Sequence, residues 1–416
     1  MRKAESVVRF GLGAMACVAA TAFTVSCTDG SHPSGVTAPA GTANGLASAT
    51  AKLAAGAIKH VFIVIVENQD IVSTYGPGTP ATYLADTLTA MGAFLPQYYG
   101  IGHASLDNYI AMISGIAPDT ATSDDCSVNT DFIDSGNAPD GQIKGDGCTY
   151  PHRVHTIADQ MDQAHLTWHG YFEDMGNIPT REAKTCGHVP IGAVDITNDA
   201  VPTDEYAARH NPFVWFHSIT DWSTCQRNVV SWQNLYTDLS SVATTPNYVF
   251  IVPNTCHDGH DAPCVTGEPG GLIDVNRTLK VLIPQILASP AYKQDGLLII
   301  TTDEGELNNG ADACCNEMPG PNEALPGGYG PGGGQIGAVL ISRFIKPGTV
   351  STTPYNHYSM LKTVEDLYGM GEHLGYAGQA GLVPMGTDVF TNPSGVVSAA
   401  AVAFHPVDPA VLHRGK

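Results

Sequence analysis

Four uninterrupted runs of apolar residues constrain the fold of this chain more than any other feature of its sequence. Each run lacks the polar alternation of a strand with one solvated face, so each is typical of a strand buried on both faces, as in a parallel sheet. The runs cover residues 60–66, 248–252, 296–302 and 337–342, and helical patterns between them cover 155–164, 232–239, 275–287 and 358–368. The sequence therefore predicts an α/β fold with helices flanking a central, mostly parallel sheet.

Polar side chains follow three of these predicted strands at the point where each strand ends. In open α/β sheets, ligands bind at the edge formed by the carboxyl ends of the strands. One such cluster is explained equally well as a solvated turn, but three of them indicate a shared site. The first strand is followed by Glu67 and Asn68, the second by Asn254, His257, Asp258, His260 and Asp261, and the third by Asp303 and Glu304.

Residues 102–115 place a hydroxyl group at the start of a predicted helix. Apolar residues at 106, 109, 110 and 113 recur at helical spacing, and Ser105 stands immediately before them, at the expected N-cap. The free N–H groups of the first turn would then point at the group that Ser105 attacks, and this geometry suits a phosphate. The alternative is that Ser105 only caps the helix.

The polar clusters contain the ligands that a divalent cation prefers. Glu67, Asn68, Asp303 and Glu304 offer hard oxygen atoms, and the 16 histidines of the chain would also admit a transition metal. A cation at this edge would lower the pKa of the serine hydroxyl and neutralise charge on a phosphoryl group. The sequence thus predicts a metal site next to the nucleophile and leaves the identity of the metal open.

Further side chains are candidates for binding phosphate oxygens or for donating a proton to the leaving alcohol. His103 and Asn108 flank Ser105 and could donate hydrogen bonds to the phosphate. His257, His260 and His357 each adjoin a predicted strand or helix end, and imidazole is the usual general acid near neutral pH. Each histidine could instead serve only as a structural hydrogen-bonding group.

The charge balance and the cysteines narrow the class of protein. A formal net charge of −21 repels nucleic acid, so we expect no nucleic-acid partner.

Ten cysteines are present, of which eight follow the N-terminal leader, and this even number favours disulfides in an exported protein. Their order suggests the pairs Cys126–Cys148, Cys186–Cys225 and Cys256–Cys264 and leaves the adjacent Cys314 and Cys315 open.

The two ends of the chain read as segments outside the catalytic fold. Residues 1–27 have the basic start and apolar stretch of a secretory signal, and Cys27 ends a sequence that resembles a lipobox. Residues 28–56 have the composition of a flexible tether, 57–395 would form the catalytic domain, and 396–416 a C-terminal tail. The sequence predicts a secreted protein or one held by a lipid anchor on the outer face of the membrane.

In their order along the chain, these motifs resemble those of the bacterial phosphoesterase family that contains phospholipases C and secreted acid phosphatases. The resemblance implies an alkaline-phosphatase-like fold, Ser105 as nucleophile and Asn108 as phosphate donor. It implies one or two metal ions, and it makes His257, His260 and His357 metal ligands or phosphate contacts. The motifs that carry it are Glu67-Asn68, His103 to Tyr109, Pro253 to Asp261, Asp303-Glu304-Gly305 and Asn356 to Ser359.

We therefore expect an exported, metal-dependent acid phosphatase that hydrolyses phosphate monoesters, phosphoinositides among them, through a phosphoseryl intermediate. Its partner would be a small phosphate ester or a phospholipid substrate. One alternative is a phospholipase C that cleaves phosphodiester lipids. A different class of function, a catalytically inactive cell-surface binding protein, stays open because a fold does not determine a function.

Overall fold

The computed structural model describes residues 53–396 of the chain, except for residues 55, 306–312 and 329. The predicted signal segment 1–27 with Cys27 lies outside the described residues, as do nearly all of the predicted tether and tail. Within the described part, no helix combines the length and the apolar character needed to cross a membrane.

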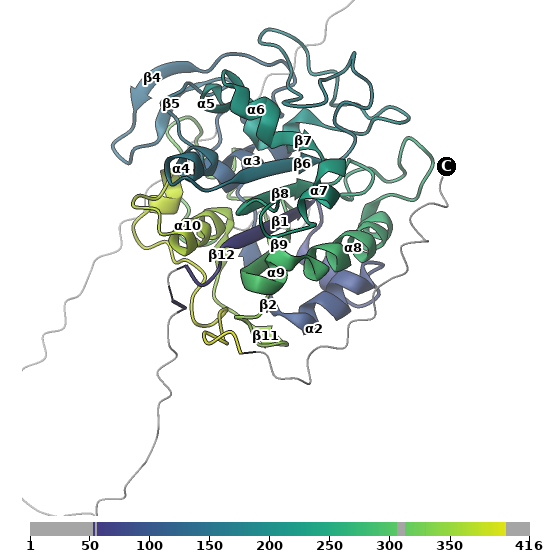
Figure 1. Cartoon of the computed structure of the whole chain (residues 1–416). Helices are drawn as coiled ribbons and strands as arrows, with labels where there is room; N and C mark the ends of the chain where they lie inside the picture. Colours follow the sequence, from purple (N-terminus) through teal and green to yellow (C-terminus); the bar gives the residue numbers. More distant parts are fainter. Residues whose placement is uncertain (1–52, 55, 306–312, 329, 397–416) are drawn as a thin grey trace, which may run out of the picture. The chain divides into compact units, whose positions relative to one another are not determined.

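An eight-stranded sheet forms the centre of the described part (Figure 1). Its five strands from β9 to β7 run parallel, whereas β10 runs antiparallel to both β9 and β2. The predicted α/β class with a mostly parallel sheet is therefore confirmed. Across the sheet, the strands are β11 (Thr349–Val350), β2 (Ala93–Leu95), β10 (Ala338–Ser342), β9 (Gly296–Thr302), β1 (His60–Val66), β8 (Tyr248–Val252), β6 (Trp168–Phe172) and β7 (Val229–Ser231).

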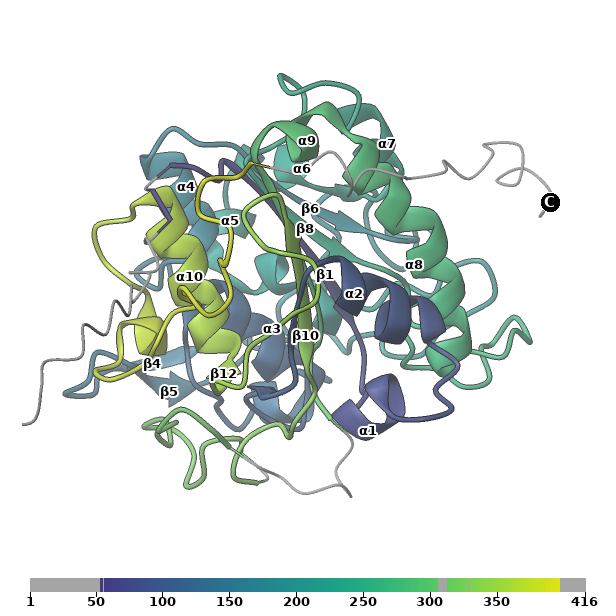
Figure 2. The same ribbon diagram turned by 90° about the horizontal axis from the view of Figure 1, so that it is seen from below.

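Helices cover both faces of this sheet, as Figure 2 shows. On one face lie α3 (Ser105–Ser114), α4 (Ile157–Gln163) and α10 (His357–Tyr368), and on the other lie α2 (Thr89–Met91), α8 (Gly271–Ala288) and α9 (Pro290–Asp295). The remaining helices and turns are α1 (Ile71–Tyr75), η1 (Tyr83–Leu88), η2 (Thr122–Asp124), η3 (Ala208–His210), η4 (Pro212–Trp215), α5 (His217–Thr220), α6 (Ser223–Asn228), α7 (Gln233–Asp238) and η5 (Gly375–Gly378). Two small ribbons, β3 (Tyr98–Tyr99) with β12 (Tyr355–Asn356) and β4 (Ile133–Asn137) with β5 (Ile143–Asp146), complete the fold.

Strand β1 shows why its sequence lacks polar alternation. All seven of its residues are buried, and successive side chains point to opposite faces of the sheet. Ile63 and Ile65 belong to the core that includes Tyr109 and Ile113 of α3, whereas the core on the other face contains Phe62 and Val64. Because both faces are covered, the positions from 61 to 66 carry apolar side chains, and the polar first residue, His60, has a partner in Asp295.

The pairing of β1 with β9 sets the position of the candidate site. Val66, the last residue of β1, lies opposite Thr302, the last residue of β9. The next residues, Glu67 and Asp303, therefore leave the sheet side by side. The sequence predicts this meeting of strand ends, and the parallel register produces it.

Four disulfides are present among the described residues. The three predicted pairs, Cys126–Cys148, Cys186–Cys225 and Cys256–Cys264, are confirmed. The two adjacent cysteines that the sequence left open, Cys314 and Cys315, are bonded to each other. The first three cross-links close segments with sequence separations of 22, 39 and 8 and so restrain the irregular connections between strands.

Removal of the Cys186–Cys225 disulfide should destabilise the protein. The bond closes a segment with a sequence separation of 39, so its loss in Cys186→Ala/Cys225→Ala should lower the free energy of unfolding by about 2–5 kcal/mol. Chemical denaturation of the oxidised proteins measures this difference. Eight free thiols in the described part of the natively produced protein would contradict it.

Glu365 should make the stability of the protein depend on pH. Burial raises the pKa of Glu365 to about 8. A 2.8 Å hydrogen bond from the N–H of Leu374 has the opposite effect on the pKa but is the smaller of the two. The folded protein then holds a proton that the unfolded chain has released, so the free energy of unfolding falls as the pH rises from about 4.5 to about 8.

The neutral variant Glu365→Gln tests this dependence. Within that interval the Glu365 contribution has a slope of about 1.4 kcal/mol per pH unit, and the variant should lose it. Chemical denaturation of both proteins at several pH values measures the two slopes. The same slope in wild type and variant would show that Glu365 does not titrate in this way.

Candidate active site

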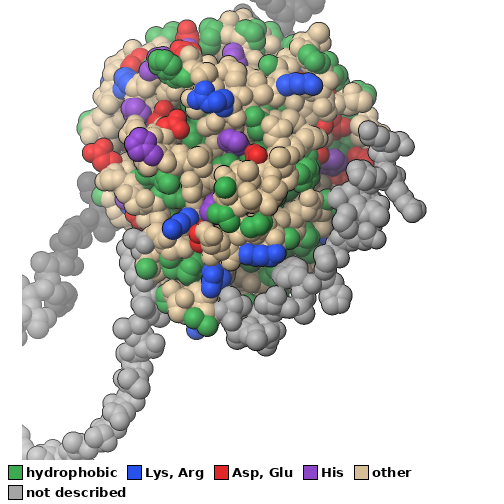
Figure 3. Space-filling model, in the orientation of Figure 1, with side chains coloured by type: hydrophobic (Ala, Val, Ile, Leu, Met, Phe, Trp, Pro, Cys, Tyr) green, Lys and Arg blue, Asp and Glu red, His purple; other side chains and the backbone are tan. Residues whose placement is uncertain are grey.

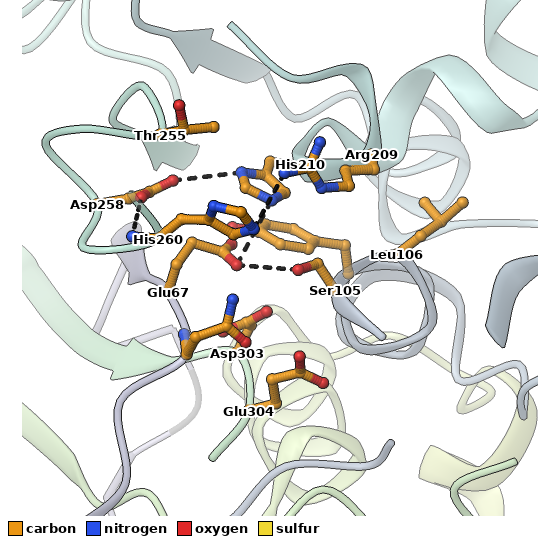
Figure 4. A network of polar contacts seen from close by, with 12 residues as sticks. Glu67, Ser105, Leu106, Arg209, His210, Thr255, Asp258, His260, Asp303 and Glu304 are labelled. Carbon is orange, nitrogen blue, oxygen red and sulfur yellow. Dashed lines mark hydrogen bonds and ion pairs between the residues drawn. The ribbon is translucent and has the colours of Figure 1, made fainter. Parts of the chain in front are cut away.

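Glu67, immediately after β1, lies at the centre of a buried polar network (Figure 4). The hydroxyl of Ser105 donates a hydrogen bond to its Oε2 atom at 3.0 Å. The hydroxyl of Tyr109, one helical turn further along α3, donates to the other carboxylate oxygen. Helix α3 therefore presents two hydroxyl groups to one carboxylate, and Ser105 is directed into the network.

The start of α3 differs from the prediction by one residue. Ala104 is the N-cap and Ser105 is the first helical residue, so the prediction that Ser105 caps the helix is wrong. The N–H of Leu106 donates instead to the carboxylate of Asp125 at 2.9 Å, so a distant segment supplies the acceptor. The Ser105 hydroxyl is consequently free of a capping role and can reach Glu67.

Asn108 holds the loop that precedes the helix. Its Oδ1 atom accepts hydrogen bonds from the N–H groups of Ile101 (2.7 Å) and Gly102 (3.2 Å). Its Nδ2 atom donates to the carbonyl of Gly102 at 3.0 Å and to Oε2 of Glu304 at 3.2 Å. In this structure the amide of Asn108 therefore positions the loop before α3 and also Glu304, whereas the sequence predicted that it donates a hydrogen bond to the phosphate.

Gly102 in this loop leaves no space for a larger residue. A Cβ atom at this position would lie 2.4 Å from Oδ2 of Asp107, which is itself buried. The close approach of the loop to the first turn of α3 thus depends on glycine.

His210 joins Glu67 to Asp258. Its Nδ1 atom lies 3.2 Å from Oδ2 of Asp258, and its Nε2 atom lies 3.4 Å from Oε2 of Glu67. Its ring stacks on Tyr109 with a centroid separation of 5.5 Å. The sequence contains no strand or helix pattern that points to His210, which is the last residue of the short turn η3.

The Asp303 side of the site is held by its neighbours. Oδ1 of Asp303 accepts a hydrogen bond from the N–H of Asn68 at 3.0 Å. The carbonyl oxygen of Asp303 lies 2.6 Å from Nε2 of His357, whose Nδ1 atom lies 3.0 Å from the hydroxyl of Tyr98. Because a carbonyl oxygen only accepts, Nε2 of His357 carries the proton. Both ring nitrogens of His357 thus have hydrogen-bond partners, and this side chain holds the backbone of Asp303 in place.

Two of the other predicted histidines lie close to this network. Arg209 donates from Nη2 to Nε2 of His260 at 3.1 Å, and the backbone N–H of His260 donates to Asp258. Nδ1 of His103 lies 3.1 Å from the carbonyl oxygen of Gly305, two residues after Asp303. The structure therefore brings His103 and His260 to the same edge of the sheet as Glu67.

His257 has different partners. Its Nδ1 atom lies 2.9 Å from Oε2 of Glu173, which follows β6, and its Nε2 atom lies 3.8 Å from Glu268. Burial lowers the pKa of His257, but the hydrogen bond and charge of Glu173 outweigh this effect and raise it to about 9. His257 thus belongs to an ion-pair cluster that adjoins the Glu67 network.

The electrostatics of the network favour a bound cation. Burial raises the pKa of Glu67 well above its usual range, and the charges of Asp303 and Asp258 raise it further. Burial also raises the pKa values of Asp258, Asp303 and Glu304. Several buried carboxylates can remain ionised together only if positive charge lies among them.

The donor atoms have an arrangement that fits such a cation. Glu67, His210 and Asp258 each offer one ligand atom, and these atoms all lie within 4.8 Å of one another. Burial lowers the pKa of His210 well below its usual range, so its imidazole is neutral and suited to metal ligation. Carboxylate and imidazole ligands together suit zinc, manganese or iron as well as harder cations.

Comparison with known proteins identifies the family. Residues 78–371 match the model of the phosphoesterase family. The chain belongs to the phosphoesterase family. This membership confirms the predicted family and, at the level of the family, the predicted class of phosphoric ester hydrolase.

Relatives of this phosphoesterase include named phosphatases. The chain is 28% identical over 283 residues to the phosphate-repressible acid phosphatase of Penicillium chrysogenum. The match covers 68% of this chain and 53% of the relative, so the chain spans about half of the length of that protein. It is 24% identical to the phosphatidylinositol-3-phosphatase of Mycobacterium tuberculosis, over 80% of this chain and 82% of the relative. A solved structure from Vibrio parahaemolyticus, described as an alkaline phosphatase superfamily protein, aligns with a TM-score of 0.44 at 15% identity, over 76% of this chain and 69% of that one.

Divalent cations should stabilise this phosphoesterase through the carboxylates at the strand ends. A cation at 100 times its dissociation constant should add about 2.7 kcal/mol to the free energy of unfolding of the wild type. Asp303→Asn should reduce this gain strongly, because it removes one negative charge from the network. Thermal unfolding of chelator-treated protein with Mg²⁺, Mn²⁺ or Zn²⁺ added separately measures the effect.

The control for this experiment is Asp131→Asn. The side chain of Asp131 is 62% exposed and pairs with His217, away from the network, so this variant should respond to cations as the wild type does. Without a cation, Asp303→Asn should be at least as stable as the wild type, because it relieves like-charge repulsion. Equal cation responses in wild type and Asp303→Asn would contradict the metal site.

Proposed function

We propose that this phosphoesterase hydrolyses phosphate monoesters through a phosphoseryl intermediate on Ser105. The observation that carries the proposal is the contact of Ser105 Oγ with Glu67 inside a buried set of carboxylate and imidazole groups. A hydroxyl group directed at a cation site, at the carboxyl edge of the sheet, is suited to attack a phosphorus atom. The names of the relatives, acid phosphatase and phosphatidylinositol-3-phosphatase, support the same reaction.

The chemistry divides into two displacements at phosphorus. In the first, Ser105 Oγ gives up its proton and forms a bond to phosphorus, the bond from phosphorus to the ester oxygen breaks, and the leaving alcohol takes up a proton. In the second, water attacks the phosphoseryl group and loses a proton, the bond from phosphorus to Oγ breaks, Oγ regains a proton, and inorganic phosphate is released. The hydrogen bond to Glu67 orients Oγ, and Tyr109 fixes the Glu67 carboxylate by bonding its other oxygen.

A divalent cation bound by Glu67, His210, Asp258 and Asp303 would supply positive charge that favours ionised Ser105 and offsets the charge of the phosphoryl oxygens. Glu304 and Asn68, which the sequence also assigned to the metal, adjoin Asp303 and remain candidate ligands. The number of bound ions, one or two, remains a prediction from the sequence.

Arg209, His260 and His103 are our candidates for contacts with the substrate. Arg209 brings a positive charge beside His260, and such a pair suits the oxygens of a phosphate dianion. The carbonyl of Gly305 holds the proton of His103 on Nδ1, which leaves Nε2 as a buried atom without a hydrogen-bond partner among the described residues. That atom could accept a hydrogen bond from the water that attacks in the second step.

We further propose that the protein acts outside the cytoplasm. Four disulfides among the described residues support an oxidising compartment. The signal segment, the lipid anchor at Cys27 and the limits of the tether and tail remain predictions from the sequence.

Ser105→Ala should abolish turnover of p-nitrophenyl phosphate while leaving the fold intact. Loss of a covalent nucleophile should lower kcat by several orders of magnitude. Ser114→Ala, at the other end of the same helix, is the matched control and should retain activity, because its hydroxyl bonds, within the described part of the chain, to the backbone of Ile110 and Ile116. Activity above about one tenth of wild type in Ser105→Ala would refute the nucleophile assignment.

The choice of substrates in this assay separates the proposal from its alternatives. Hydrolysis of p-nitrophenyl phosphate that is lost with chelator supports the metal-dependent monoesterase. Preferential hydrolysis of bis(p-nitrophenyl) phosphate or phosphatidylcholine would indicate a phospholipase C. No turnover of any ester, with metal bound, would indicate a binding protein, and a test with phosphatidylinositol 3-phosphate addresses the phosphoinositide prediction.

A further inference from the structure

Residues 190–196 show an inverted pattern of burial at the surface. Ile191, Val194 and Ile196 are 48%, 63% and 55% exposed, whereas Asp195 between them is buried. The Asp195 carboxylate accepts hydrogen bonds at 2.7 Å from both the N–H and the hydroxyl of Thr197, which is buried too. In a surface segment facing only water, the polar side chains would point outward and the aliphatic ones inward.

A second segment extends this surface. Val128 is 44% exposed and forms an isolated bridge with Val194, and the N–H of Asp195 donates to the carbonyl of Ser127 at 3.0 Å. We call Val128, Ile191, Val194 and Ile196 the aliphatic strip. Segments 127–130 and 190–196, both fully described, carry no exposed ionisable side chain. The strip itself is thus apolar and is held in place by backbone hydrogen bonds, while exposed acidic side chains, Asp131 and Asp199, lie just beyond its two segments.

Both segments of the strip are tied to the candidate active site. Asn198, two residues after Ile196, accepts hydrogen bonds from Arg209 through its carbonyl (3.3 Å) and its side-chain oxygen (3.2 Å), and Arg209 contacts His260. Asp125, three residues before Val128, accepts the hydrogen bond of the Leu106 N–H beside Ser105. A surface that binds the strip would therefore lie next to the candidate site.

We propose that the aliphatic strip docks this phosphoesterase on a neutral lipid bilayer. The proposal rests on the proposed function, because it brings a lipid-borne phosphate ester to the Ser105 site. The strip consists of Val and Ile, whereas protein interfaces depend mainly on Trp, Tyr and Arg. Short aliphatic side chains without charge suit insertion among headgroups and acyl chains.

The charge of the chain selects the kind of bilayer. A net charge of −21 disfavours strongly anionic surfaces, and Lys and Arg side chains lie at separate points across the face shown in Figure 3. A zwitterionic phosphatidylcholine surface that contains a minor fraction of phosphorylated lipid complements an uncharged strip. Increasing the content of anionic lipid should therefore weaken binding.

Flotation of the full chain with phosphatidylcholine vesicles tests the proposal. All proteins carry Cys27→Ser, so that no lipid anchor can form and the N-termini are identical. Val194→Asp and Ile196→Asp should each reduce the fraction bound by about tenfold or more, because each inserts a charge into the strip. Val383→Asp is the matched control, since Val383 is 52% exposed and lies outside the strip, and it should bind as the wild type does.

Turnover of soluble p-nitrophenyl phosphate separates failure of docking from failure of the proposed function. All three variants should keep wild-type turnover of this substrate, because the strip holds none of the proposed catalytic groups. Lack of turnover together with strip-dependent flotation would refute the proposed function and leave the docking. Wild-type protein that does not float, or Val194→Asp that floats equally well, would overturn the docking proposal. A dimer that Val194→Asp abolishes, without vesicle binding by the wild type, would instead assign the strip to self-association.

Discussion

The parallel pairing of β1 with β9 is the constraint on which the candidate site depends. Its register ends both strands at the same level, so that Glu67 and Asp303 emerge together from the buried centre of the sheet. Two carboxylates in such a place repel each other and lack water, and burial raises the pKa of both. The surrounding side chains and N–H groups fix both carboxylates in positions that suit a positively charged ligand.

Three supports from two helices, α3 and α10, keep this arrangement in place. Tyr109 of α3 bonds Glu67, His357 at the start of α10 bonds the carbonyl of Asp303, and Asn108 bonds Glu304. Each support comes from an element packed on the same face of the sheet. Packing of α3 and α10 thus does more than bury apolar surface, because it fixes the groups around the proposed nucleophile. The proposed docking of the aliphatic strip would bring a lipid substrate close to these groups, because Asn198 beside the strip accepts a hydrogen bond from Arg209, which contacts His260.

Much of the fold could be predicted because burial on both faces leaves a direct mark on the sequence. The runs at 60–66, 248–252 and 296–302 became β1, β8 and β9 with the predicted limits. The sequence did not reveal β6, in which His169 and Gly170 interrupt an aromatic run, or the antiparallel direction of β10. The direction of a strand depends on the path by which the chain returns to the sheet, and the hydrophobic pattern of the strand contains no information about that path.

The sequence was enough to predict the class of the fold, the strand ends that carry acidic residues and a helix start within one residue of Ser105, and it suggested three disulfide pairs that only the structure fixes. These features depend on neighbouring residues or on their order along the chain. Only folding shows that His210 lies between Glu67 and Asp258 and that Asp125 accepts the hydrogen bond of the Leu106 N–H at the start of α3. Only folding likewise shows that His357 bonds the carbonyl of Asp303 while His257 pairs with Glu173. A histidine side chain can serve as ligand, proton donor or structural hydrogen-bonding group, and only the partners that folding places around its two nitrogens select among these roles.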